Sequence, residues 1–263
     1  LMRSLLMKKI KWEMIKEGIL DWLYPRHIKC IFCNEELDEN SHNDTCVDCL
    51  SKLPFIKSPC PRCGGERNEN NDGVCLNCKT NNFDFSIARS VFVYTDDIVK
   101  VIHKYKYNYL KCLSEPLSGF MSDYFATSDL SADFITAVPL HENRLKERGF
   151  NQSELLARAL GTKFNIKYLD LCVKIVDNSR QASLGFAERK ANVKGAYKIK
   201  GEYKKTIKDK TIMIVDDVYT TGATTSEIAR VIKDAGARDV VVFTLAHGQG
   251  DGQSEEVENK KDK

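Results

Sequence analysis

The chain has 263 residues, of which 42% are apolar and 29% are charged, and its net charge is +3 with a pI near 8.3. These values are ordinary for a globular protein, and a charge this small makes global attraction to nucleic acid a weak argument. No run of about 18 apolar residues predicts a transmembrane helix. The opening LMRSLLMKKIKW lacks the apolar core and cleavage site of a secretory signal, so we expect a cytoplasmic protein.

Residues 1–25 form the first zone. Apolar residues recur there at helical spacing and lysines interrupt them, which predicts an amphipathic leader helix packed on the rest of the protein. A helix that binds a membrane surface or a partner is the alternative.

The second zone, residues 26–82, holds eight of the ten cysteines and has little hydrophobic periodicity, so it needs a metal staple. The cysteines form four C-x2-C pairs: Cys30 and Cys33, Cys46 and Cys49, Cys60 and Cys63, Cys75 and Cys78. Two such pairs complete one tetrahedral four-thiolate site, so we expect a double zinc ribbon with two structural Zn²⁺ ions and no zinc catalysis. An iron–sulfur cluster or redox-active dithiols are alternatives.

Two pairings of the four cysteine pairs are open. The short intervals of 12 and 11 residues inside each half favour sequential ribbons, in which the first and second pairs share one ion. A cross-brace would join the first pair to the third and the second to the fourth.

The third zone, residues 83–247, alternates short apolar strands with helical patterns, which predicts an α/β fold with a mostly parallel sheet and helices on both faces. The expected strands are 87–94, 134–138, 171–176, 211–215 and 240–245, and the expected helices are 98–110, 116–124, 152–164 and 224–235. The tail, residues 248–263, has almost no apolar residue, and we expect it to be disordered.

The segment TIMIVDDVYTTGAT, residues 211–224, carries the strongest functional signal. An apolar strand brings Asp216 and Asp217 to its carboxyl end, where they can accept hydrogen bonds from ribose hydroxyls or hold Mg²⁺. The small residues that follow lead into a helix whose free amides can bind a phosphate: Thr220, Thr221, Gly222, Ala223 and Thr224. The segment resembles the 5-phosphoribosyl-1-pyrophosphate (PRPP) signature of type I phosphoribosyltransferases.

Two basic segments have possible roles beside this site. Arg144 and Arg148 follow the strand that ends at Pro139, a position that suits a loop for the diphosphate group. The stretch that contains Arg180, Gln181 and Arg189 is typical of a mobile flap that excludes water. Ordinary surface loops are the alternative for both.

The chain also resembles a known family through VPLHENRLKERGFNQSELLA (138–157), SRQASLGFAERKANVKGAY (179–197), the TTGAT loop and the preceding CxxC module. In combination these segments are similar to the ComF family, the ComFC-type proteins linked to natural DNA uptake in bacteria. The resemblance implies a type I phosphoribosyltransferase fold behind a zinc-ribbon module, and a role with incoming single-stranded DNA.

Whether the chain catalyses is open on the sequence. An active phosphoribosyltransferase would transfer phosphoribose from Mg²⁺·PRPP to a nucleobase-like acceptor, but no base-recognition element follows Val240. A binding role is favoured by the stretch 100–111, where cations alternate with aromatics that can stack on unpaired bases, with these candidates: Lys104, Tyr105, Lys106 and Tyr107. An amphipathic helix with half-buried aromatics is the alternative. Other competence proteins are a further possible partner, through the zinc module.

Overall fold

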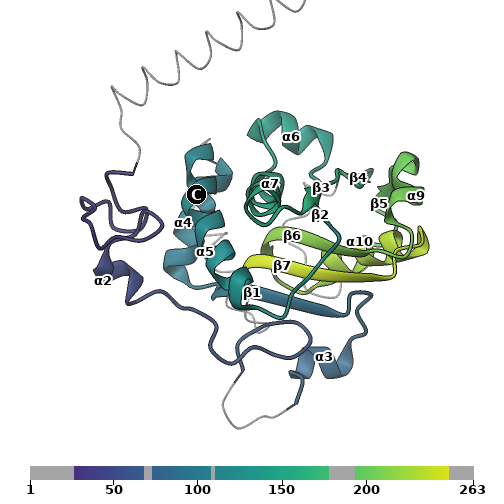
Figure 1. The fold of residues 1–263 in the computed structure, drawn as a ribbon, viewed down its shortest axis with the longest axis horizontal. Coiled ribbons are helices and arrows are strands. Elements are labelled where there is room, and N and C mark those ends of the chain that lie inside the picture. Colours follow the sequence, from purple (N-terminus) through teal and green to yellow (C-terminus); the bar gives the residue numbers. More distant parts are fainter. Residues whose placement is uncertain (1–26, 68–72, 108–109, 178–192, 249–263) are drawn as a thin grey trace, which may run out of the picture. The chain divides into compact units, whose positions relative to one another are not determined.

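The computed structural model describes residues 27–67, 73–107, 110–177 and 193–248 (Figure 1). The predicted leader helix, the flap candidates Arg180, Gln181 and Arg189, and the tail beyond Gly248 lie outside these ranges. The chain divides into two compact units, one up to Lys52 and one from Leu53 onwards. In the described part of the chain, no helix has the length and apolar character needed to cross a membrane.

The same small ribbon occurs once in each unit. Its first cysteine pair lies in a tight turn closed by an isolated β-bridge, Lys29 with Glu36 in the first ribbon and Pro59 with Glu66 in the second. Its second pair lies at the start of a short helix, α2 (Val47–Leu50) or α3 (Leu76–Thr80). The doubled cysteine pattern of the sequence is therefore a doubled structure, and the second copy belongs to the same unit as the sheet.

A five-stranded parallel sheet with the order β1-β7-β6-β2-β3 forms the centre of the larger unit. Its strands are β1 (Ile87–Val93), β2 (Phe134–Ala137), β3 (Lys167–Tyr168), β6 (Thr211–Tyr219) and β7 (Asp239–His247). The helices of this unit after α3 are α4 (Asp96–Tyr107), η1 (Lys111–Leu113), α5 (Ser114–Thr127), α6 (Glu142–Arg148), α7 (Gln152–Phe164), η2 (Gly201–Tyr203), α9 (Lys204–Ile207) and α10 (Ala223–Asp234).

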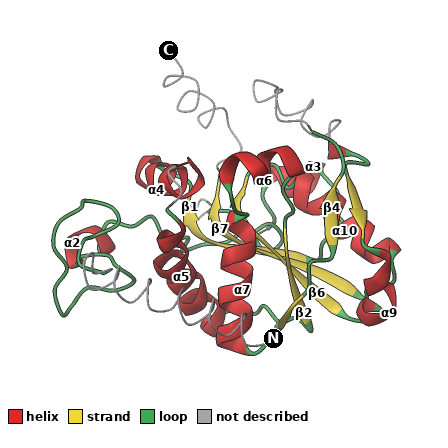
Figure 2. Ribbon diagram, turned by 90° about the horizontal axis from the view of Figure 1, so that it is seen from above, coloured by secondary structure: helices red, strands yellow, loops and turns green. Residues whose placement is uncertain are grey.

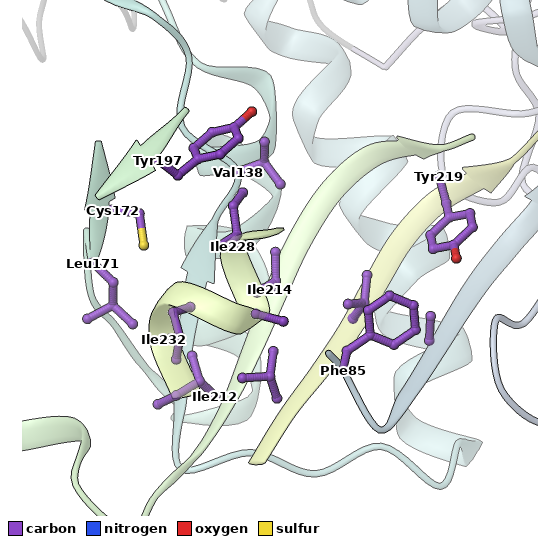
Figure 3. Close-up of a cluster of buried hydrophobic side chains, with 14 of the residues drawn as sticks. Phe85, Val138, Leu171, Cys172, Tyr197, Ile212, Ile214, Tyr219, Ile228 and Ile232 are labelled. Atoms are coloured by element: carbon purple, nitrogen blue, oxygen red, sulfur yellow. The ribbon is translucent and has the colours of Figure 1, made fainter. Parts of the chain in front are cut away.

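Period-two alternation along the central strands gives the sheet two buried faces. Ile212 and Ile214 of β6 belong to a buried cluster with Ile228 of α10 (Figure 3). On the other face, Phe243 of β7 packs against Phe125 of α5, with ring centroids 6.1 Å apart. Helices therefore cover both faces, which explains why these strands are apolar at successive positions.

The expected fold class, an α/β parallel sheet preceded by a zinc-ribbon module, is confirmed. Three local expectations differ in part from the structure. The strand expected at 171–176 is present as the shorter β4 (Cys172–Lys174), but it lies outside the main sheet and pairs antiparallel with β5 (Tyr197–Ile199) beside α10 (Figure 2).

The other two concern the neighbours of the site. The basic segment after Pro139 is helix α6, because His141 caps it by accepting the amide of Asn143 and Gly149 ends it in a left-handed conformation. Strand β6 continues through the two aspartates to Tyr219, since it stays paired with β7 up to His247.

Candidate functional site

Asp216 and Asp217 lie near the carboxyl end of β6 and are held by different helices. The hydroxyl of Ser153, in the first turn of α7, donates to Oδ1 of Asp216 at 2.7 Å. The ammonium of Lys106, near the end of α4, lies 3.1 Å from Oδ2 of Asp217. Two helices that cross from other parts of the chain therefore orient the two carboxylates.

The charges of Asp216, Asp217 and Lys106 interact strongly with one another. Partial burial, and then the negative charge of Asp217, raise the pKa of Asp216 well above its ordinary value. Burial, the largest single influence, lowers the pKa of Lys106, but the neighbouring groups, with Asp217 first among them, together raise it above its ordinary value, so the lysine stays protonated. The pair of aspartates is thus partly neutralised by one cation before any ligand binds.

The loop Thr220–Gly222 joins these carboxylates to helix α10. Gly222 is the N-cap residue of α10 with φ of 76°, and as a glycine it has no side chain that could cap the helix. The Thr221 hydroxyl accepts the amide of Ala223 at 3.2 Å. The next amides of the first turn have no partner within the helix and lie beside two carboxylates, which is an arrangement that can bind a phosphate group.

A second wall of the site was not predicted from the sequence. Tyr197 of β5 is buried, and its hydroxyl is hydrogen-bonded to Thr224 at the start of α10. The ammonium of Lys174, on β4, lies 5.9 Å from the centre of the Tyr197 ring. Tyr197 ends the quoted segment 179–197, but nothing in its sequence indicates that β4 and β5 pair beside α10.

The two arginines expected at a diphosphate group point in different directions from α6. Arg144 pairs with Glu147 at 3.0 Å, and its positive charge adds to the effect of burial in lowering the pKa of Lys174. Arg148 contacts Tyr107 of α4, with its guanidinium 4.9 Å from the ring centre and a hydrogen bond of 3.2 Å to the hydroxyl. Arg144 thus stays a candidate for binding the diphosphate group, whereas Arg148 lies against the surface of α4.

The four nucleic-acid candidates all lie on helix α4, but on different sides of it. Tyr105 is fully buried and donates to the carbonyl of Gln152 at 2.9 Å, so it cannot stack on a base, and that part of the prediction was wrong. Lys106 is held at Asp217, as described above. Lys104 and Tyr107 are exposed. Since an α-helix turns 100° per residue, four neighbouring positions cannot share one face.

The eight cysteines gather into two sets, Cys30, Cys33, Cys46, Cys49 and Cys60, Cys63, Cys75, Cys78, whose sulfurs lie within 4.8 Å of one another. The preferred sequential pairing is therefore confirmed. Neighbouring sulfurs are 3.6 Å apart between Cys33 and Cys46, and between Cys63 and Cys75. Tetrahedral zinc with Zn–S bonds of about 2.3 Å requires about 3.8 Å.

Backbone amides around the knuckles also favour thiolates. Burial raises the pKa of Cys30 and of Cys60, but amide hydrogen bonds outweigh it and lower each to about 7. In the second site the amide of Cys75 donates to Sγ of Cys60 at 3.3 Å. Both sets fit structural zinc ions, whose closed coordination would hold the ribbons and offer no position to a substrate.

Comparison with known proteins agrees with both parts of the chain. A double zinc ribbon domain matches residues 19–79. Over 228 residues the chain is 26% identical to Competence protein F of Haemophilus influenzae, covering 84% of this chain and 97% of that protein. It is 28% identical to Competence protein ComFC of Streptococcus pneumoniae, covering 83% and 99% of the two chains. The DNA utilization protein YhgH of Escherichia coli K12 is also 28% identical, with 78% and 90% covered.

Solved structures match more distantly. They include a glutamine PRPP amidotransferase from B. subtilis, with 20% identity, a TM-score of 0.33, and coverage of 49% of this chain and 25% of that one. A hypoxanthine phosphoribosyltransferase from Staphylococcus aureus is 13% identical with a TM-score of 0.30, and the match covers 56% of this chain and 69% of that one. The resemblance to the ComF family that the sequence motifs predicted is confirmed by the curated relatives, because competence and DNA-utilization proteins match about four fifths of the chain.

Proposed function

We propose that this chain binds a phosphorylated ribose, with PRPP as its ligand, and acts on or binds single-stranded DNA during DNA uptake. One observation carries the first half: two carboxylates and a helix start with a glycine N-cap lie next to each other at the carboxyl end of β6. Carboxylates accept ribose hydroxyls, and helix amides bind phosphate.

The parts of the ligand can be assigned to side chains. The 5-phosphate binds Thr220–Thr224, and the ribose hydroxyls bind Asp216 and Asp217. Oδ2 of Asp216 and Oδ1 of Asp217 accept no hydrogen bond within the described part of the chain. Two such oxygens fit Mg²⁺ held largely by water and ligand oxygens. Because Lys106 offsets one negative charge, we expect Mg²⁺ to bind only together with the diphosphate.

Calorimetry of the full chain with PRPP, with and without Mg²⁺, tests this site. The Asp217→Asn variant replaces a charged carboxylate acceptor with a neutral amide and should bind at least tenfold more weakly, since a hydrogen bond to a charged group contributes about 1.5–3 kcal/mol. Asp97→Asn, on exposed α4 surface, removes the same charge away from the site and should bind as the parent does. No heat with the parent chain would reject the proposal.

The DNA half is supported by the names of the relatives and by one surface cluster. On α4, the rings of His103 and Tyr107 contact each other at a tilt of 36° with centroids 4.6 Å apart, and Arg148 lies over Tyr107. An exposed aromatic beside cations suits a strand of unpaired bases, through stacking and phosphate contacts.

Single-strand binding is measured as a function of salt for Tyr107→Ala and Arg148→Gln. We expect Arg148→Gln to lower both the affinity and the salt slope, and Tyr107→Ala to cost about 1–3 kcal/mol with the slope unchanged. Arg238→Gln removes an exposed cation elsewhere and serves as the control. Equal affinity of all variants would show that DNA does not bind here.

A second function, transfer of phosphoribose to a nucleobase-like acceptor, is favoured by the β4–β5 pair beside α10. Tyr197 contacts Thr224 at the start of α10 and Lys174 lies 5.9 Å from the Tyr197 ring, so the pair can serve as the acceptor element that the sequence lacks after Val240. Pyrophosphate release with a panel of bases tests it. Release with any base makes the chain an enzyme, and no release leaves the binding role.

A further inference from the structure

Tyr219 lies between the phosphate loop and the second zinc site. It is the last residue of β6, directly before Thr220, and its side chain is 1% exposed. Its ring stacks on His247 with centroids 4.6 Å apart and meets the edge of Phe85 at 6.2 Å. Tyr219 and Phe85 are side by side at one end of the buried cluster in Figure 3. The ring is therefore a fixed part of the core directly behind the loop.

The loop rests on this ring. A Cβ atom added to Gly222 would lie 2.2 Å from the Tyr219 hydroxyl and 2.8 Å from the Phe83 ring, so the hydroxyl touches the backbone of Gly222. The carbonyl of Tyr219 accepts the amide of Gly248 at 2.7 Å, and Gly248 in turn lies against Thr220. A displacement of Tyr219 must displace Gly222, the N-cap residue of α10.

The other side of the same stack touches the zinc knuckle. A Cβ atom on Gly65 would lie 2.6–2.9 Å from three atoms of the His247 ring, so this ring lies flat on the backbone of Gly65. The carbonyl of Gly65 accepts the amide of the ligand residue Cys60 at 2.8 Å. Cys60 and Cys63 belong to the same buried cluster as Tyr219. The charges of the four cysteines also reach the phenol, since, after burial, they raise the pKa of Tyr219.

Hydrogen bonds hold the knuckle on the sheet independently of the metal. The amide of Ala88 on β1 donates to the carbonyl of Arg62 at 2.7 Å, and the guanidinium of Arg89 donates to the carbonyl of Pro61 at 3.1 Å. These bonds anchor the first half of the knuckle, whereas Cys75 and Cys78 come from a different segment and need the metal to join it. Loss of zinc therefore loosens the turn at Gly65 before it loosens β1.

We propose that Tyr219 is a positioning residue through which the second four-cysteine site shapes the phosphate loop, so that zinc at this site and phosphate at the loop stabilise each other. This inference rests on the proposed ribose-phosphate function. The first four-cysteine site lies in the other compact unit and provides the control. By linkage, a ligand that binds better when zinc is present must raise zinc affinity by the same factor.

A competition titration with a chromogenic zinc chelator measures this factor. The full chain is titrated with and without saturating ribose 5-phosphate, in the parent and in a Cys30→Ser/Cys33→Ser variant that retains only the second site. We expect ribose 5-phosphate to raise the affinity for one zinc in the parent, and for the single zinc in the variant, by about 5-fold or more.

Two substitutions of Tyr219 separate positioning from general packing. Tyr219→Phe loses the hydroxyl, which has no hydrogen-bond partner among the described residues, but keeps the stack on His247 and the ring carbon Cζ, which would lie 2.7 Å from a Cβ on Gly222, so most of the coupling persists. Tyr219→Leu removes the ring, and the factor falls to about one while zinc still binds. Equal zinc affinity with and without ribose 5-phosphate in the parent overturns the inference if calorimetry shows that the ligand binds.

Hydrogen exchange decides the inference if calorimetry shows no binding, an outcome that rejects the proposed function alone. Chelation of the second zinc in the Cys30→Ser/Cys33→Ser variant should then lower the protection of amides 220–225, while α7 keeps its protection. Unchanged protection of the loop overturns the inference, because zinc then has no effect on the structure of the loop. An equal loss of protection in α7 also overturns it, because zinc then stabilises the whole unit and not the loop in particular.

Discussion

Replacing Gly222 with alanine perturbs the phosphate loop at its most crowded residue. Two costs add at this position. Its φ of 76° is left-handed, which costs an alanine about 1–2 kcal/mol. The new Cβ would also lie 2.2 Å from the Tyr219 hydroxyl and 2.7 Å from its Cζ, and overpacking of this kind costs about 1–3 kcal/mol. We expect Gly222→Ala to lower the free energy of unfolding by about 2–5 kcal/mol.

Two other glycines separate these costs. Gly195 has nearly the same φ, 74°, but a Cβ there meets nothing within 4 Å, so Gly195→Ala measures the backbone cost alone. Gly201 has neither a left-handed φ nor a neighbour within 4 Å, and Gly201→Ala should be neutral or stabilise by up to about 1 kcal/mol. The order of stability is therefore expected to be Gly201→Ala, Gly195→Ala and Gly222→Ala, from the highest to the lowest.

Urea unfolding of the four full-length chains gives the free energies, and calorimetry gives the affinity for ribose 5-phosphate. Adding Tyr219→Phe to Gly222→Ala removes the closest clashing atom, so part of the loss should return with a coupling energy of about 0.5–3 kcal/mol. The contact between the ring and the loop is refuted if Gly222→Ala costs no more than Gly195→Ala, or if the double variant gains nothing.

The remaining predictions concern His247, Lys106 and the zinc sites. Burial lowers the pKa of His247 to about 4, so as the pH drops below about 6.5 the unfolded chain takes up a proton that the folded chain does not, and stability falls. From pH 6.5 to 5.5 the free energy of unfolding of the parent should fall by about 1 kcal/mol more than that of His247→Gln, measured by urea unfolding at each pH. Equal slopes would show that His247 is not buried neutral. Lys106→Met leaves Asp217 without its cation, so we expect Mg²⁺ to bind without PRPP, as calorimetry with Mg²⁺ alone would detect; no heat would contradict the role given to Lys106. Metal analysis should give two zinc ions per chain, and Cys63→Ser should retain one of them. Because Cys63 is buried in the core of the sheet unit, Cys63→Ser should destabilise that unit more than Cys33→Ser does, and equal destabilisation by the two variants would contradict this expectation.

The sequence was sufficient for features that depend on local pattern. The C-x2-C spacing determined two four-cysteine sites, because two thiolates three residues apart are brought together by one turn. The run from Thr211 to Thr224 determined a strand, two carboxylates and a helix start, since apolar residues followed by small and acidic ones have few other stable arrangements. The domain boundaries and the assignment of PRPP stay predictions.

Tertiary structure decided what lies around these elements. Tyr105 and Lys106 are neighbours in an alternating basic and aromatic stretch, yet one is buried and the other reaches Asp217, because only the packing of α4 against the sheet sets which side of the helix faces inward. The pairing of β4 with β5 joins residues more than 20 positions apart, and no local pattern encodes it. The contacts from Gly65 through His247 and Tyr219 to Gly222 connect three distant segments, and such contacts exist only once the chain has folded, since they depend on atoms that meet across the core.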